Sequence, residues 1–188
     1  MTTEHERRFH GEADRLRSAE RITLLEIDRV VVLAVEDLRT PRVLDVGTGT
    51  GLFAEAFAAK GLAVAGIDTN LAMLHAARRF VPSADFREGA AEAIPYGDKM
   101  FDLVFLGHVL HEVDNPVAAL EEARRVSTNR VAVLEWPYVE EEQGPPLAHR
   151  LNVATVISAA RQAGFGQVEH LKLAHMDLYR MTIQAPSS

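Results

Sequence analysis

The chain contains no cysteine. This absence excludes disulfides, thiolate-bound metals and cysteine nucleophiles, and it predicts a protein of the reducing cytoplasm. Long apolar runs are missing too, because no segment approaches the roughly 20 residues of a membrane-spanning helix. Residues 1–21 are crowded with Glu and Arg and lack the apolar centre of a signal peptide. We therefore expect a cytoplasmic protein with no membrane span.

Basic charge is also scarce. The 20 Lys and Arg residues are outnumbered by 27 Asp and Glu residues, which gives a net charge of −7. A general nucleic-acid binder needs a basic surface, so we expect no nucleic-acid partner. With 188 residues, 47% of them hydrophobic, the chain fits one globular unit. Within it we distinguish an N-terminal helical arm and helix, residues 1–39, from a main domain, residues 40–188.

The N-terminal segment is polar up to Ile22. Residues 3–21 are predicted to form a polar helix or an arm. Thr23 and Glu26 have the spacing of a capping box, and apolar residues follow at helical spacing. We therefore expect an amphipathic helix to begin there, although the apolar run at residues 30–33 is also compatible with a strand.

After Pro41, short apolar runs alternate with helical patterns; a helix is predicted over Asn70–Phe80, and Asn115 is a predicted N-cap followed by proline at the first helical position. The predicted strands are Val43–Val46, Leu62–Ile67, Phe101–Leu106 and Val131–Trp136, followed by a hairpin of Val168–Leu173 and Met176–Ile183. The alternation predicts an α/β fold with a doubly wound, Rossmann-like sheet of about seven strands. We expect the sheet to be mostly parallel, with an antiparallel C-terminal hairpin strand and helices on both faces.

A glycine-rich segment, Asp45–Gly51, follows the first predicted strand and opens a helix. Glycines at such a turn let the backbone approach a ligand closely and adopt unusual φ angles. The spacing of Gly49, Gly51 and Ala54 also satisfies the loose dinucleotide-binding pattern. A tight strand-to-helix turn with no ligand is the remaining alternative.

Asp68 ends the second predicted strand, about 20 residues after the glycines. A carboxylate in this position accepts hydrogen bonds from both hydroxyls of a ribose. It is also well placed to cap the helix that begins near Asn70, and the two roles are compatible.

These segments resemble, in order and spacing, the class I S-adenosylmethionine-dependent methyltransferases over about residues 40–165. Val43–Gly51 resembles the family's motif I, and Asp68 matches its ribose-binding acid. Residues 88–96 resemble its adenine-side loop, and residues 101–113 resemble its fourth strand with the turn that follows. The small-molecule branch related to ubiquinone and menaquinone biosynthesis is the most similar.

The resemblance implies an enzyme that uses S-adenosyl-L-methionine to methylate a small-molecule acceptor. The cofactor-binding residues that it implies are Asp45, Gly47, Thr48, Gly49, Gly51, Asp68, Thr69, Met73, Ala90, Ala91, Glu92, Gly107 and His108. The family often has Asp where this chain has Ala90, so backbone groups must hold the adenine here. Losing that hydrogen bond is expected to cost roughly 1–3 kcal/mol of affinity.

His108 and His111 stand three positions apart after the fourth predicted strand. Zinc is disfavoured because the pair lacks the i, i+4 spacing of helical sites and a clear third ligand, so we expect no metal. His108 is interpreted as a wall of the methionine pocket. His111 is our candidate general base, because its ordinary pKa suits that work, with a packing role as the alternative.

The expected reaction is an in-line displacement at the cofactor's methyl group, in which the protein mainly positions and desolvates the reactants. We expect the substrate chamber to be formed by the arm before Thr23, the turn Gly107–Val113 and the connector Trp136–Arg150, with His111 and Trp136 facing it. Residues 1–18 are expected to act as a gate. A homodimer stays open, as do two rival functions: a non-catalytic S-adenosylmethionine-binding module and a nicotinamide-dependent oxidoreductase.

Overall fold

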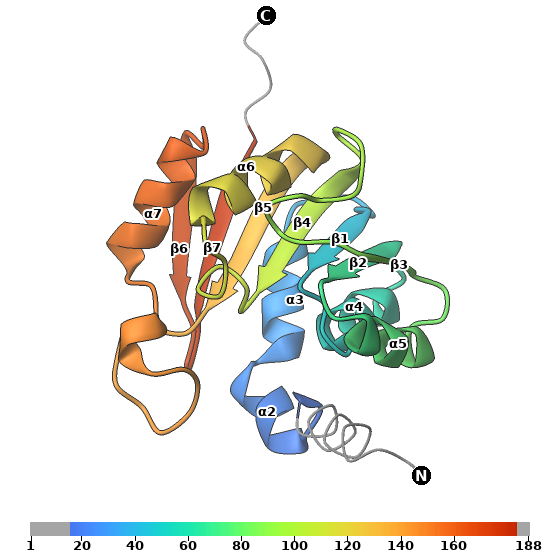
Figure 1. Ribbon diagram of the computed structural model, residues 1–188, viewed down its shortest axis with the longest axis horizontal. Helices are drawn as coiled ribbons and strands as arrows, with labels where there is room; N and C mark the ends of the chain where they lie inside the picture. Colours follow the sequence, from blue (N-terminus) through green and yellow to red (C-terminus); the bar gives the residue numbers. More distant parts are fainter. Residues whose placement is uncertain (1–15, 184–188) are drawn as a thin grey trace, which may run out of the picture.

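The fold is built on one seven-stranded sheet in a computed structural model that describes residues 16–183. The strands are β1 (Val43–Val46), β2 (Val64–Asp68), β3 (Asp85–Glu88), β4 (Phe101–Gly107), β5 (Ser127–Glu135), β6 (Gln167–Lys172) and β7 (Asp177–Thr182). Their order is β3-β2-β1-β4-β5-β7-β6 (Figure 1). The first five strands are parallel, and β7 runs antiparallel between β5 and β6. The predicted fold class is confirmed.

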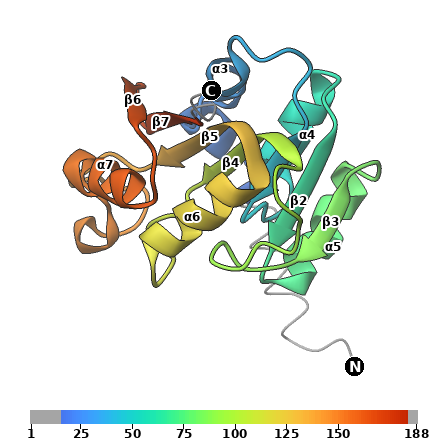
Figure 2. The same cartoon turned by 90° about the horizontal axis from the view of Figure 1, so that it is seen from above.

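Helices cover both faces of this sheet (Figure 2). They are α2 (Ala19–Leu24), α3 (Ile27–Val35), α4 (Leu52–Ala59), α5 (Leu71–Phe80), α6 (Pro116–Val126) and α7 (Val153–Gln162), with a short 3₁₀ turn at Leu147–His149. One core cluster joins α6 and α7 to the sheet, and a second joins α3 and α4 to its other face. Because both faces are covered, the central strand β1 is buried along its whole length rather than at alternate residues.

The N-cap predicted at Asn115 is confirmed because capping depends on local contacts, and Asn70, predicted as the first residue of the second helix, is the N-cap of α5. Asn70 accepts hydrogen bonds from the backbone of α5, and Asn115 accepts one from Ala118 N at 3.1 Å. Pro116 follows at the first helical position, where its missing N–H leaves no unpaired donor within the helix.

The capping box predicted at Thr23 and Glu26 is wrong. Thr23 lies in the last turn of α2, where its hydroxyl donates to Ala19 O at 2.9 Å. Glu26 adopts a left-handed conformation, with φ of 47°, between α2 and α3. Its carboxylate accepts from Ala174 N at 2.7 Å, a contact with a distant segment that sequence spacing does not reveal. Residues 30–33 are helical, so the strand alternative is also wrong.

Two strand predictions were incomplete. No strand was predicted at β3, whose only buried residue is Phe86, because an exposed edge strand carries little apolar signal. Strand β5 begins at Ser127 rather than at Val131. Its polar start is held by tertiary contacts, such as the hydrogen bond from the Thr128 hydroxyl to Asp102 Oδ1 at 3.0 Å.

Candidate functional site

A cavity of about 620 Å³ lies at the carboxyl ends of β1, β2 and β4. Its volume falls in the range of small-molecule pockets. Five segments line it: residues from 16 to 25, the loop 46–53, residues 68–73, the loop 89–92 and the turn 107–114. The described chain therefore brings together eleven of the predicted cofactor residues in this lining, which are Gly47, Thr48, Gly49, Asp68, Thr69, Met73, Ala90, Ala91, Glu92, Gly107 and His108.

The glycine loop turns sharply beneath the cavity. Thr48 N donates to Ile67 O and Gly51 N donates to Thr48 O, both at 2.8 Å. Gly49 has a φ of 53°, and a Cβ atom added there would meet no atom within 4 Å. A side chain at Gly49 would thus be strained and would extend into open space on the cavity side. Gly51 does not line the cavity but caps the start of α4.

Asp45 lies beneath the loop and is absent from the cavity lining. Its carboxylate is 2% exposed and accepts a hydrogen bond from the Thr48 hydroxyl at 2.7 Å. Burial raises the pKa of Asp45 to about 7, although the Thr48 hydrogen bond opposes the shift. The residue predicted as a direct cofactor contact therefore holds Thr48 in place from below.

Asp68 joins the glycine loop to the end of β2. Its Oδ2 accepts from Gly49 N and its Oδ1 accepts from Asn70 N, each at 2.8 Å. The side chain is half-buried and also faces the cavity. Ribose binding and helix capping are thus both compatible with the position of Asp68, because each carboxylate oxygen keeps a second lone pair.

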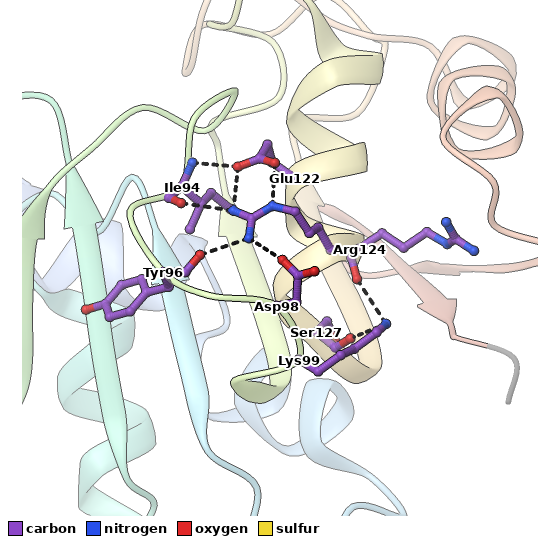
Figure 3. Close-up of polar contacts among 8 residues, drawn as sticks. Ile94, Tyr96, Asp98, Lys99, Glu122, Arg124 and Ser127 are labelled. Atoms are coloured by element: carbon purple, nitrogen blue, oxygen red, sulfur yellow. Dashed lines mark hydrogen bonds and ion pairs between the residues drawn. The ribbon is translucent and has the colours of Figure 1, made fainter. Parts of the chain in front are cut away.

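The loop that carries Ala90 and Glu92 is fastened to α6 by two side chains of that helix, Glu122 and Arg125, which also pair with each other (Figure 3). Ile94 N donates to Glu122 Oε2 at 2.9 Å, and Arg125 donates to the carbonyls of Ile94 and Tyr96 at 3.0 and 2.9 Å. The Arg125 hydrogen bonds hold the pKa of Glu122 below its ordinary value. Sequence reasoning missed this clamp, since it joins residues about 30 positions apart.

His108 lines the cavity in a left-handed conformation, with φ of 59°. Its ring lies 5.0 Å from the Trp136 ring, centroid to centroid. Both ring nitrogens are buried and have no hydrogen-bond partner within residues 16–183. Burial lowers the pKa of His108 to about 3, with smaller contributions from Arg21 and His111, so the ring is neutral.

His111 lies behind the lining, against the end of β5. Its Nδ1 is 2.8 Å from Glu135 Oε2, and its backbone N donates to Glu135 Oε1 at 3.1 Å. Nε2 stands 3.7 Å from Glu112 Oε1, and Glu112 does line the cavity. Burial lowers the pKa of His111, but the hydrogen bond and charge of Glu135 outweigh it and raise the pKa above its ordinary value.

The predicted substrate chamber is only partly reproduced. Leu16, Arg21 and Leu25 bring the N-terminal segment into the lining, and the turn after β4 contributes as expected. None of the described connector residues 136–150 lines the cavity, and Trp136 lies behind His108. Arg150 folds the connector onto itself by donating to the carbonyls of Pro137, Val139, Gln143 and Pro145. Most of the predicted gate, residues 1–15, lies outside the described residues.

Between residues 16 and 183, no group of three His, Asp or Glu side chains is placed to hold a metal ion. None of the described helices is long and apolar enough to cross a membrane.

Comparisons with known proteins agree with this arrangement. Residues 44–132 match the model of the family described as "Methyltransferase domain". The chain is 42% identical over 99 residues to a demethylmenaquinone methyltransferase of Renibacterium salmoninarum, covering 53% of this chain and 42% of that protein. It is 36% identical over 95 residues to a ubiquinone biosynthesis O-methyltransferase of Paracidovorax citrulli, covering 47% of this chain and 40% of that protein. The matched segments thus span less than half of either relative.

Among solved structures, the fold is similar to a SAM-dependent methyltransferase from Aquifex aeolicus. The TM-score is 0.82 at 22% sequence identity, and the match covers 93% of this chain and 98% of that one. This likeness extends over both halves of the sheet.

Proposed function

We propose that this chain is a class I S-adenosylmethionine-dependent methyltransferase that transfers a methyl group from S-adenosyl-L-methionine to a small-molecule acceptor, supported by its matches to a methyltransferase domain family and to quinone methyltransferases. One observation carries the proposal. The glycine loop, Asp68 and the loop 89–92 line a single cavity at the carboxyl ends of the parallel strands, where ligands of open α/β sheets bind.

The residues present fit this cofactor. The open space over Gly49 leaves room for its amino-acid end beside the loop backbone, and Asp68 offers acceptors for ribose hydroxyls. Backbone groups of Ala90–Glu92 then hold the adenine, helped by apolar contact. When bound, the sulfonium supplies an already activated methyl group, so the protein's task is to position the acceptor and exclude water.

The acceptor is proposed to be a small aromatic molecule of the quinone-precursor type. Support comes from the names of the two relatives and from the apolar side chains in the lining, among them Leu25, Phe53 and Val109. His111 is proposed to accept a proton from it. We also propose a cytoplasmic protein that binds no nucleic acid, with homodimer formation left to direct measurement.

A methyl-transfer assay tests the proposal. Full-length protein is incubated with S-adenosylmethionine labelled in the methyl group and with reduced demethylmenaquinone or a small-molecule extract. Labelled product is expected, and the Asp68→Ala variant should form much less of it. Tight binding of S-adenosylhomocysteine without any product from either source would favour a non-catalytic binding module. Failure to bind S-adenosylhomocysteine at all would overturn the proposal.

A further inference from the structure

Glu135 is a buried carboxylate that contacts the candidate base from two sides. It is the last residue of β5 and is 1% exposed. Its Oε1 accepts from His111 N and its Oε2 lies 2.8 Å from His111 Nδ1. A buried carboxylate is costly unless it is paired, and the ion-pair partner that the structure gives it is His111.

This double contact fixes the imidazole. An ionised carboxylate only accepts hydrogen bonds, so the 2.8 Å contact requires the proton of a neutral His111 to sit on Nδ1. Nε2 is then the free acceptor, and it stands 3.7 Å from the Glu112 carboxylate at the cavity wall. The contact to the backbone N holds the turn itself, so ring and main chain are oriented together.

We propose that Glu135 is a positioning residue that makes His111 the proton acceptor of this site, and that the methyl acceptor therefore presents an O–H or N–H group. The inference rests on the proposed function. As the acceptor's nucleophilic atom, either the deprotonated heteroatom or a ring carbon activated by it, bonds to the methyl carbon, the carbon–sulfur bond breaks and S-adenosylhomocysteine leaves; after attack by a ring carbon, the proton on that carbon moves back to the oxygen. The proton of the acceptor passes to His111 Nε2, and Glu135 balances the charge of the imidazolium, as the carboxylate does in a Ser-His-Asp triad.

The surroundings of the two histidines separate their roles. Glu135 and Glu112 favour the imidazolium form of His111, whereas burial and the charge of Arg150 oppose it. Among the described residues, neither ring nitrogen of His108 has a hydrogen-bond partner, and the ring stays neutral. Titratable groups whose environments push their pKa values apart are a recurring sign of acid–base roles. His111, although farther from the cavity, is thus the better proton acceptor.

A purely structural explanation is also testable. The Glu135 carboxylate accepts from two backbone N–H groups, those of His111 and Trp136, which would serve packing alone. In that case its charge would matter little to the imidazole, and Glu135→Gln would leave the titration and tautomer of His111 unchanged.

The test is a ¹⁵N-histidine NMR titration of the free full-length protein. In the wild type, neutral His111 is expected to carry its proton on Nδ1, and a proton on Nε2 would overturn the proposal without any variant. Glu135→Gln should shift the pKa of His111 downward, while the exposed Glu121→Gln control should not. An unchanged pKa in Glu135→Gln would also overturn it.

Kinetics complete the test. With reduced demethylmenaquinone, Glu135→Gln should lower kcat by roughly 10²-fold, the lower end of a general base's contribution, at little change in KM. The acidic limb of the pH profile of kcat should move to lower pH in Glu135→Gln, and Glu135→Asp should recover part of the rate. An unaltered pH profile of kcat in Glu135→Gln would refute the positioning role of Glu135. Failure of the wild type to bind S-adenosylhomocysteine would refute the proposed function instead, because the titration of His111 can be read in the free protein.

Discussion

Gly49 and Gly61 form a matched pair that separates backbone strain from ligand contact. Both have a positive φ, 53° and 78°, and an added Cβ would meet no atom within 4 Å of either. Only Gly49 lines the cavity. Each valine variant should lose about 1–2 kcal/mol of stability from the left-handed conformation. Gly49→Val alone should abolish binding of S-adenosylhomocysteine, as measured by calorimetry on folded protein. Equal affinities in the two variants would remove the glycine loop from the site.

Asp68 is expected to contribute directly to affinity. Asp68→Ala removes acceptors for the ribose and also frees Gly49 N and Asn70 N. Binding of S-adenosylhomocysteine should weaken by roughly 1–3 kcal/mol, which is about 5–150-fold. The isosteric Asp68→Asn, which keeps one carbonyl acceptor, should lose less. If both variants bind S-adenosylhomocysteine as the wild type does, Asp68 serves only to connect the end of β2 to the glycine loop.

Asp45 should make stability fall as pH rises. Burial raises its pKa from 3.8 to about 7, so the folded state binds the proton more tightly than the unfolded chain. The folded state therefore loses this advantage between about pH 4 and 7, in the sense required by proton linkage. Asp45→Asn should flatten the decline, as measured by urea unfolding of both proteins at several pH values. Parallel curves for variant and wild type would show that Asp45 is ionised when folded.

Elements fixed by local contacts were the ones that the sequence predicted best. The glycine turn and the cap at Asn115 depend on residues within a few positions of each other. The start of α3 does not, since Glu26 is held by Ala174. The same reasoning explains why β5 was predicted to begin only at Val131. Its first residues are polar and are held in the strand by pairing with β4.

The contacts of Arg125 and Glu122 in α6 offer a test at the scale of the elements. Arg125→Gln removes the contacts to Ile94 O and Tyr96 O and leaves Glu122 without its cation. Stability should fall by about 1–3 kcal/mol, and affinity for S-adenosylhomocysteine should fall with it because the loop 89–92 loosens. The neighbouring Arg124→Gln is the control, since its side chain points away from this cluster (Figure 3). A loss of the same size in both variants would show a general effect of charge on α6.

At the scale of the whole molecule, the site follows from the order of the strands. Asp68, the loop 89–92 and the turn 107–114 are far apart in sequence, but parallel strands bring their carboxyl ends to one edge. This rule made the site predictable. The place of Leu25 in the cavity wall and the pairing of His111 with Glu135 were not predictable, because they depend on how separate elements pack at that edge. A polar residue at the end of the buried fifth strand was the one available signal for Glu135.

The central claim is that this cavity binds S-adenosylmethionine rather than a dinucleotide. Calorimetric titration of the full-length protein with S-adenosylhomocysteine and, separately, with NAD tests it most directly. We expect one molecule of S-adenosylhomocysteine to bind per chain, with affinity weakened by Asp68→Ala, and no binding of NAD. Binding of NAD, or S-adenosylhomocysteine binding that is unaffected by both Gly49→Val and Asp68→Ala, would contradict the account.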